Sequence, residues 1–232
     1  MKILAIITAR AGSKRIPGKN KRLLGGIPLI MWSINTAKKV DELCDILVST
    51  DDPDIAKISE SANVLVPWLR PNFLATDTAT SVDVCLHAIT WYEKNKYLVD
   101  GVLLLQPSSP FRNLQSITRG INIFKNNMNR SVVGVSKTIS HPEWCFRIEG
   151  DRMHPYLENF SAGTRSQDLP EAYIINGGFY LISTDKLKKE KTFFSKDMIP
   201  LEMNQLGENI DIDTEFDWDV AETQLKYQND IK

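Results

Sequence analysis

The chain opens with an unbroken apolar run, Ile3 to Ile7, which stops at a loop of small and cationic residues. A short apolar run without polar alternation is typical of a parallel strand buried on both faces. Small residues fill much of the loop, and its cations are Arg10, Lys14, Arg15 and Lys19. Backbone N–H groups and cations directly after a buried strand are well suited to bind phosphate groups. The stretch therefore predicts a phosphate-binding loop, and a solvated basic loop is the alternative interpretation.

This loop belongs to neither of the two best-known phosphate-binding motifs. The Gly-x-x-x-x-Gly-Lys-Ser/Thr pattern needs a second glycine that is missing here at the required spacing. The Gly-x-Gly-x-x-Gly pattern is also absent, because Pro17 lies between Gly12 and Gly18. A phosphate site at this position would belong to a third kind of loop.

Beyond the loop, strand-like and helix-like patterns alternate. Apolar residues spaced for one face of a helix recur, for example, at Val82, Cys85 and Ile89. The predicted strands cover 2–8, 44–49, 64–66, 101–105, 131–136 and 179–182, and the predicted helices cover 28–39, 53–62, 78–95, 114–126, 184–190 and 214–227. Asp77 or Thr78 is expected to cap the third helix. This order predicts an α/β fold with a mostly parallel, Rossmann-like sheet and helices on both faces.

The alternation breaks between residues 137 and 173. This segment lacks helical periodicity, contains several prolines and glycines, and carries the aromatic residues Trp144, Phe146, Tyr156 and Phe160. Aromatic side chains in a polar, non-periodic insert favour an arm that packs on a second subunit. A β-hairpin packed on its own domain is the alternative.

Length and composition limit the class of protein to which the chain can belong. The 232 residues are enough for a single domain, 1–232, with the inserted arm at about 137–173. A formal net charge of −1 argues against general nucleic-acid binding. The widely spaced Cys44, Cys85 and Cys145 indicate reduced thiols in a cytoplasmic protein. The N-terminus resembles a strand rather than a signal peptide, and no apolar run approaches the ~20 residues that span a membrane.

A second strong signal is the segment Asp211-Ile212-Asp213. Residues two apart in an extended segment project to one side, so both carboxylates are expected to point the same way. Two carboxylates suit Mg²⁺, which keeps water ligands and binds together with substrate phosphates, and Mn²⁺ is also suited to oxygen ligands. The alternative, acids favouring a helix start, explains Glu215 and Asp217 better than Asp211 and Asp213. The cationic loop and the pair of acids, Asp211 and Asp213, together predict a metal-dependent enzyme that handles nucleotides.

Several motifs together resemble the acylneuraminate cytidylyltransferases, enzymes that make CMP-activated nonulosonic acids. The first is the opening stretch from Ala9 to Asn20, which matches the family pattern Ala-Arg-x-Gly-Ser-Lys-x-x-Pro-x-Lys-Asn. The others follow in family order: Val48-Ser49-Thr50-Asp51, Arg70-Pro71, Leu74 to Ala79, Leu105 to Arg112, Asn176-Gly177 and Ile210 to Glu215. The resemblance implies a nucleotidyltransferase that moves CMP from CTP to the anomeric C2 hydroxyl of a sialic or legionaminic acid, releasing pyrophosphate.

The resemblance also implies roles for individual residues. Arg10, Ser13, Lys19, Asn20 and Arg70 would bind the nucleotide, with Arg10 and Lys19 neutralising the triphosphate. The proposed sugar contacts are Gln106, Arg165 and Tyr173, and the proposed metal ligands are Asp211 and Asp213. Arg165 lies in a stretch one residue longer than the family's, which leaves its register open. Either Asp211 or metal-bound water would accept the proton.

One departure from the family bears on the sugar. Sialic acid enzymes commonly carry a basic residue where this chain has Tyr173-Ile174-Ile175, so a less polar sugar such as legionaminic acid is expected. The family's dimers use the inserted arm, which implies a homodimer. The alternatives are a CMP-pseudaminate or CMP-Kdo synthetase, or a nucleotide-binding protein without turnover.

Overall fold

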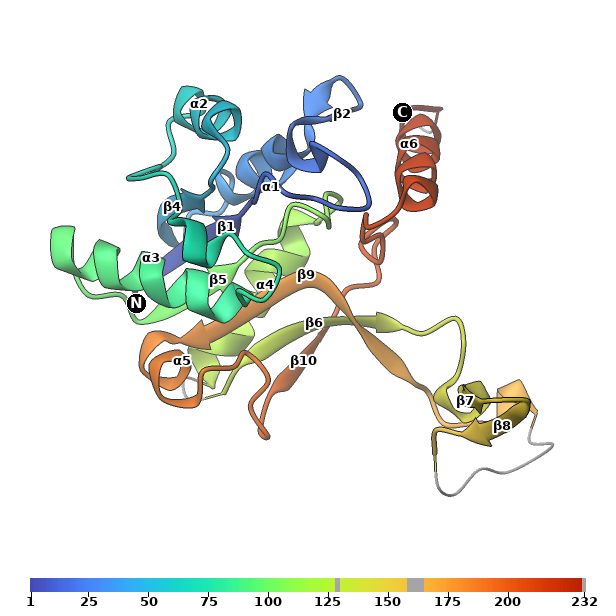
Figure 1. Cartoon of the computed structure of the whole chain (residues 1–232). Helices are drawn as coiled ribbons and strands as arrows, with labels where there is room; N and C mark the ends of the chain where they lie inside the picture. Colours follow the sequence, from blue (N-terminus) through green and yellow to red (C-terminus); the bar gives the residue numbers. More distant parts are fainter. Residues whose placement is uncertain (128–129, 158–164, 231–232) are drawn as a thin grey trace.

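The computed structural model describes residues 1–127, 130–157 and 165–230. Within these residues the core is a six-stranded sheet with helices on both faces (Figure 1). In order across the sheet, the strands are β10 (Ile199–Glu202), β6 (Val132–Lys137), β9 (Tyr173–Ser183), β5 (Gly101–Leu104), β1 (Ile3–Thr8) and β4 (Leu43–Ser49). The pairs β10–β6, β5–β1 and β1–β4 are parallel, which confirms the predicted fold class.

β9 runs against both of its neighbours. It pairs antiparallel with β5 and with β6, so that Leu181 lies opposite Leu103 on one side and Val132 on the other. The chain leaves the sheet at the end of β6, forms the arm and re-enters with no crossover helix among the residues that the structure describes. A strand that returns in this way has to run back along the one it left.

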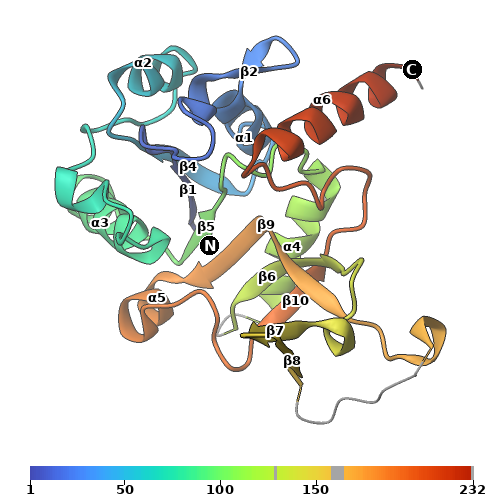
Figure 2. The same ribbon diagram turned by 45° about the vertical axis from the view of Figure 1, so that its right-hand side comes forward.

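The residues of β1 alternate between two hydrophobic cores. Ile3 and Ile7 pack in a core with α1 (Leu29–Ala37) and α4 (Leu114–Asn126), and α2 (Pro53–Ser61) joins it through Ile55. Leu4 and Ile6 pack in the core on the other face with α3 (Ser81–Asn95), and α5 (Thr184–Glu190) lies on this face as well (Figure 2). The sheet is thus covered on both sides, as predicted. No helix in the described part of the chain is long and apolar enough to cross a membrane.

A third apolar cluster lies behind the opening loop. It joins Ile16 of the loop to Phe111, Ile212 and Trp218, the last on the closing helix α6 (Glu215–Asp230). The short hairpin of β2 (Leu23–Leu24) and β3 (Ile27–Pro28) contributes Leu24. This cluster fixes the opening loop against the segment that carries the two candidate metal ligands.

The start of α3 differs from the prediction. The helix begins at Ser81 rather than Thr78, and its N-cap is Thr80, not Asp77 or Thr78. Thr80 and Asp83 form a capping box in which each side chain accepts a hydrogen bond from the other residue's backbone N–H. This reciprocal pair outcompetes a single cap three residues earlier, and it leaves Asp77 free for other contacts.

Three further differences concern short elements. Residues 64–66 were predicted as a strand, but only Leu65 makes an isolated parallel bridge, to Leu47. β10 and the β2–β3 hairpin were not predicted, because segments of two to four residues give too little periodicity to recognise. The helices at 114–126 and 184–190 were predicted with the bounds that the structure has.

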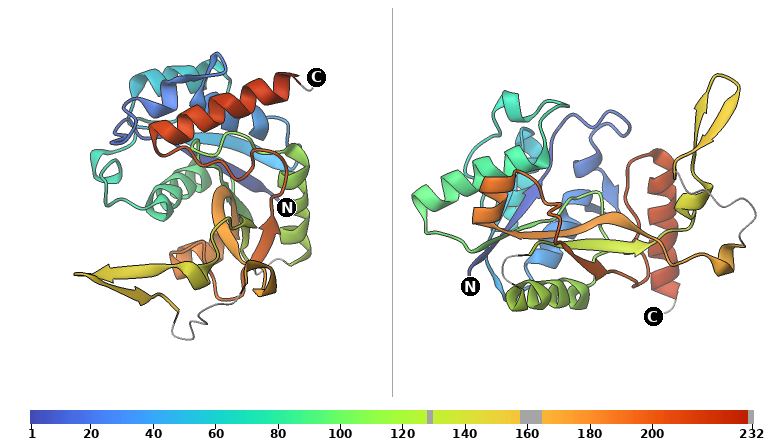
Figure 3. Two further views of the ribbon diagram at one scale, coloured as in Figure 1. Left: turned by 90° about the vertical axis from the view of Figure 1, so that its right-hand side faces the viewer. Right: turned by 90° about the horizontal axis from the view of Figure 1, so that it is seen from below.

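Within the arm, β7 (Phe146–Glu149) and β8 (Arg152–Pro155) form an antiparallel hairpin. The hairpin projects from the body of the molecule in Figures 1 and 3. Its cross-strand pair Ile148 and Met153 is 73% and 64% exposed. The hairpin is therefore not packed on its own domain. Phe160, the fourth predicted arm aromatic, lies outside the described residues.

Candidate active site

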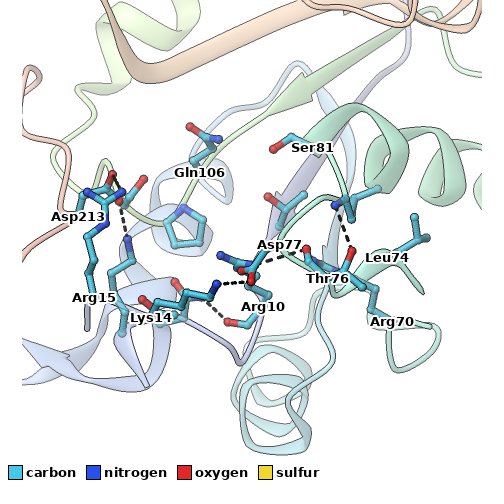
Figure 4. A pocket seen from close by; sticks show the side chains of 18 residues that line it. Arg10, Lys14, Arg15, Arg70, Leu74, Thr76, Asp77, Ser81, Gln106 and Asp213 are labelled. Atoms are coloured by element: carbon cyan, nitrogen blue, oxygen red, sulfur yellow. Dashed lines mark hydrogen bonds and ion pairs between the residues drawn. The ribbon is translucent and has the colours of Figure 1, made fainter. Parts of the chain in front are cut away.

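A cavity of about 410 Å³ lies at the carboxyl ends of β1, β4 and β5 (Figure 4). Parallel strands end at one edge of a sheet, which is where α/β proteins bind ligands. The cavity is formed by the opening loop, by parts of the segment 70–84 and by the loop after β5. It brings together most of the predicted site residues, namely Arg10, Ser13, Lys19, Asn20, Arg70, Gln106 and Asp213.

The opening loop is anchored along its length. The backbone N–H of Ala9 donates to the Ser49 carbonyl at 3.0 Å, which extends the pairing of β1 with β4. The N–H of Ala11 donates to Asp51 Oδ1 at 2.9 Å, and the buried Asn20 amide donates to the Arg10 carbonyl at 3.0 Å. Gly18, with a φ of +65°, reverses the chain before Lys19. The loop therefore has its shape before any ligand arrives.

Two carboxylates pair with the four loop cations. Asp77 contacts Lys14 Nζ at 2.5 Å and Arg10 Nη1 at 2.7 Å, and these contacts appear as dashed lines in Figure 4. Asp213 contacts Arg15 Nη2 at 3.1 Å and Lys19 Nζ at 3.2 Å. The hydrogen bond from Lys14, and then that from Arg10, hold the pKa of Asp77 below its ordinary value. The loop cations thus face the cavity already neutralised in part.

The opposite end of the cavity is less polar. Leu74, Ala79 and Val84 line it together with Ser81 and Arg70. Arg70 is only 5% exposed, and its Nε donates to Ser49 Oγ at 3.0 Å while Nη2 donates to the Ser49 carbonyl. Burial lowers the pKa of Arg70, but an arginine stays protonated at neutral pH. This end offers apolar walls and a few fixed polar groups, as a planar heterocycle requires.

The loop after β5 is held by a buried arginine. Arg112 Nη2 donates to the Gln106 carbonyl, Nε donates to the Gly178 carbonyl at 2.5 Å, and Nη1 donates to Ser33 Oγ at 2.9 Å. Burial lowers the pKa of Arg112 to about 9, so the guanidinium is charged at neutral pH. Arg112 is a positioning residue, because it fixes Gln106 relative to β9 and α1.

Asp211 and Asp213 flank the fully buried Ile212, as predicted. The N–H of Ile212 donates to the Ser108 carbonyl at 2.8 Å, which places this segment against the loop after β5. The two carboxylates line different cavities, however: Asp213 the first, and Asp211 a neighbouring cavity of about 400 Å³. Asp211 Oδ1 is 3.5 Å from Ser109 Oγ.

Gly177 lies close to one lining residue of each cavity. A Cβ built on this residue would be 2.9 Å from Ser109 Oγ, 3.5 Å from Gln106 Oε1 and 3.6 Å from Asp211 Cγ. Gly177 also has a φ of +73°, which L side chains rarely adopt. Gln106 of the first cavity and Asp211 of the second therefore both contact the space that only a glycine leaves open.

The second cavity is lined by the ends of β6 and β9. Ile174, Ile175 and Asn176 contribute from β9, and among the described residues Lys137 is the only cation in the lining. Glu171 binds both Lys137 Nζ and the Tyr173 hydroxyl, the latter at 2.9 Å. The hydrogen bond to Glu171 raises the pKa of Lys137 and also that of Tyr173.

The predicted sugar contacts are spread out. Gln106 lines the first cavity, and Tyr173 lies beside the second on β9. Arg165 is exposed at the edge of the arm, and it is absent from the lining of both cavities. One chain thus brings Gln106 near Asp211 at Gly177, whereas Tyr173 pairs with Lys137 and Arg165 lines neither cavity.

Asp211 and Asp213 supply carboxylate oxygens, which Mg²⁺ prefers, but in this structure the two side chains line different cavities. Among the described residues, no three or more His, Cys, Asp or Glu side chains gather as a metal site. Two carboxylates are nevertheless a suitable donor set for Mg²⁺ when phosphate oxygens and water supply the remaining ligands. In this structure Asp213 is instead bound by Arg15 and Lys19.

The sequence interpretation missed the roles of Asp77, Arg112 and Lys137. For Asp77 a signal existed, because Thr80-x-x-Asp83 is a capping pattern that ends the helix before Asp77 is reached. The burial of Arg112 and the pairing of Lys137 with Glu171 depend on contacts across the sheet, so no local sequence pattern predicts them.

Comparisons with known proteins identify the family of the chain. The family model described as cytidylyltransferase matches residues 4–153. The chain is 38% identical over 234 aligned positions to the CMP-N,N'-diacetyllegionaminic acid synthase of Legionella pneumophila, with 97% of each chain covered. It is 30% identical to the N-acylneuraminate cytidylyltransferase of Streptococcus agalactiae serotype V over 94% of this chain and 52% of that one.

The fold is also shared with a solved structure. The CMP:2-keto-3-deoxy-manno-octonic acid synthetase, determined in complex with CTP, has a TM-score of 0.70 with 98% of this chain and 100% of that chain covered. Its sequence identity of 15% shows a common fold alone. The family model and the 38% identical relative go further. This chain belongs to the cytidylyltransferase family, a family of nucleotidyltransferase enzymes.

Proposed function

We propose that the chain transfers CMP from CTP to the anomeric C2 hydroxyl of a nonulosonic acid and releases pyrophosphate. The observation that carries this proposal is the junction at Gly177, where a cationic cavity meets a cavity beside Asp211. Such a pair of cavities suits a nucleotide and an acceptor that react where the two meet. The name of the 38% identical relative points to a legionaminic acid as the acceptor.

In this proposal CTP occupies the first cavity. Arg10 and Lys19 bind the triphosphate and neutralise charge that develops on the departing pyrophosphate. Ser13 and Asn20 line the same part of the cavity, and Asn20 acts by holding the Arg10 backbone. The cytosine ring lies at the less polar end, where Arg70 and Ser81 provide the polar groups.

The reaction joins the C2 hydroxyl oxygen to the α-phosphorus and breaks the bond from that phosphorus to the pyrophosphate oxygen. Asp211 and Asp213 would hold Mg²⁺ or Mn²⁺, which when bound neutralises charge on the reacting phosphates. The hydroxyl proton has to leave as the bond forms. Asp211, which faces the junction of the cavities, is one acceptor that this chain offers, and solvent water is the other.

The second cavity matches a deoxygenated sugar acid. Ile174 and Ile175 present apolar surface, which favours methyl groups over hydroxyls. Lys137 provides a charge opposite to that of the sugar's carboxylate, and Tyr173 lies beside it. Legionaminic acid is therefore preferred over sialic acid. Gln106 would contact the sugar at the junction.

The arm supports a homodimer. Ile148 and Met153 on the hairpin, and Trp144 and Tyr156 beside it, are large apolar side chains, each at least 48% exposed. Burial of such a surface by a second copy would be favourable. Arg165 would then act on the partner's sugar cavity, since it lines neither cavity of its own chain.

A CTP-using reaction also agrees with a cytoplasmic location.

The experiment that tests the function is pyrophosphate release from CTP and Mg²⁺ with a panel of acceptors. We expect turnover with legionaminic acid and a lower kcat/KM with sialic acid. Exclusive turnover with pseudaminic acid or Kdo would favour the alternative sugar-acid synthetases. Binding of CTP without turnover on any acceptor would favour a nucleotide-binding protein.

A further inference from the structure

Asp77 has contacts that the proposed reaction does not use. Its two carboxylate oxygens bind two different cations of the opening loop, Oδ1 with Arg10 at 2.7 Å and Oδ2 with Lys14 at 2.5 Å. All three residues line the first cavity (Figure 4). A phosphate group placed there would bridge the same two cations in the same manner.

We infer that Asp77 is an internal counter-anion of the phosphate site: it competes with the phosphates of CTP and with pyrophosphate for Arg10 and Lys14. The inference rests on the proposed function, because it assumes that the opening loop binds phosphates. It assigns Asp77 a role in how tightly substrate and product are held.

A phosphate can replace Asp77 as the partner of Arg10 and Lys14. The side chains of Arg10, Lys14 and Asp77 are 36%, 76% and 50% exposed, so each reaches solvent and the contacts can open at little cost. Arg112 and Arg70 differ, because they are buried and bound to backbone carbonyls. The site therefore contains permanent cations with structural partners and a separate pair whose partner can be replaced.

Asp77 is not required to start α3. Thr80 and Asp83 cap that helix, and the turn before it is closed by a hydrogen bond from the Ala79 N–H to Thr76 Oγ1 at 3.2 Å. Arg10 Nη1 lies 3.4 Å from the Thr76 carbonyl as well. The turn thus holds Asp77 toward the cavity without depending on its carboxylate.

Asp213 shows why Asp77 is unusual. Asp213 also pairs with loop cations, but a bound metal would engage its carboxylate when those cations turn to the phosphates. Among the described residues, Asp77 has no comparable group that would replace the two cations. Once Arg10 and Lys14 turn to a phosphate, its negative charge is left beside the ligand and repels it. When pyrophosphate leaves, Asp77 recovers both cations.

The test is the affinity of Asp77→Asn for pyrophosphate, CTP and cytidine, each measured by calorimetry without turnover. The variant keeps the shape of the side chain and removes its charge. We expect pyrophosphate to bind about fivefold more tightly and CTP to tighten in the same direction, as the loss of exposed ion pairs allows. Cytidine, which carries no phosphate, should bind unchanged.

Two controls separate local charge from other effects. Asp77→Glu keeps the charge and should stay close to the wild-type affinities. Asp41→Asn removes one charge from an exposed turn before β4, at the opposite end of that strand from the cavity, and should change nothing. Its thermal midpoint and that of Asp77→Asn should both equal the wild-type value.

The outcomes distinguish the inference from the function on which it rests. Failure of the wild-type protein to bind CTP and pyrophosphate would count against the proposed function itself. Normal wild-type binding, with Asp77→Asn no tighter or weaker for pyrophosphate, would overturn the role of Asp77 alone. An equal change for cytidine would also overturn it, because the effect would not depend on phosphate.

Discussion

The half of the molecule that contains β1, β4 and α3 differs sharply from the half that contains β6, β9 and the arm. In the first half, site residues are fixed by neighbours: Asn20 and Arg70 are buried and hydrogen-bonded to backbone carbonyls. In the second half, Tyr173, Ile174 and Ile175 are all at least 38% exposed. The hairpin beyond them contributes to none of the three apolar clusters among the described residues.

The difference shows which ligand one chain can bind by itself. Rigid elements with satisfied polar groups hold a site in its working geometry, and the nucleotide cavity has this property. The cavity proposed for the sugar has one wall of exposed side chains and adjoins the exposed arm. We therefore expect CTP binding to depend on one chain and sugar binding to depend on two.

The largest expected effect is at the junction of the two halves. Asp211→Ala removes one proposed metal ligand and should lower kcat for pyrophosphate release by roughly a hundredfold or more. Asp211 is exposed, so the thermal midpoint should stay unchanged. Asp219→Ala, an exposed acid on α6, is the matched control. A rate near wild type would remove Asp211 from the reaction.

A charge introduced on the arm should affect the half that contains the arm and leave the other half unchanged. Ile148→Asp places a carboxylate in the exposed apolar pair with Met153 and should weaken the dimer by roughly tenfold to a hundredfold, as loss of a central interface side chain does. Light scattering measures the mass, and calorimetry measures CTP binding, which should not change. Asp151→Asn, at the tip of the same hairpin, should leave both unaffected. A wild-type monomer, or a dimer that tolerates Ile148→Asp, would contradict the comparison.

A smaller effect is expected at the sugar cavity itself. Lys137→Ala removes the only cation in its lining, and loss of one charge-assisted hydrogen bond should raise KM for the sugar acid roughly tenfold. KM for CTP should stay constant, since Lys137 does not line the first cavity. Lys137→Arg should retain most of the affinity. An equal rise in both KM values would show that the two cavities are not independent.

The smallest effect concerns the capping box beside the nucleotide cavity. Thr80→Ala should lower the free energy of unfolding by about 1 kcal/mol. Hydrogen bonds from the Thr80 side chain, and then from its backbone, lower the pKa of Asp83 below 3.8. A carboxyl with a depressed pKa stabilises the fold above its ordinary pKa, and this stabilisation is lost as the pH falls through the lowered value.

Urea unfolding of wild type and Asp83→Asn at a series of pH values measures that loss. The variant should be less stable at pH 7, and the two curves should converge as the pH falls below 3.8. A gap that stays constant with pH would mean that Asp83 acts through its shape and not its charge.

Much of the nucleotide half could be predicted from the sequence. The run Ile3 to Ile7 and the apolar face of α3 are local patterns that predict a strand and a helix, and the cationic loop directly follows that strand. The partners of Asp77 could not be predicted, because a helix cap and a cation pair are both ordinary uses of an aspartate. The antiparallel course of β9 could not be predicted either, because its apolar run 179–182 looks the same in either direction.

The sequence by itself determined the fold class, the opening loop, the family and most residues of the nucleotide cavity. These depend on periodicity and on short motifs, which act over a few residues. Only the tertiary structure decided that Asp211 and Asp213 line different cavities, that Arg112 is buried behind Gln106 and that Glu171 holds Lys137. Arg112 is held by Gly178 and Ser33, and Lys137 is held by Glu171, which all lie far away in the chain. Such contacts follow from tertiary packing and not from any local pattern.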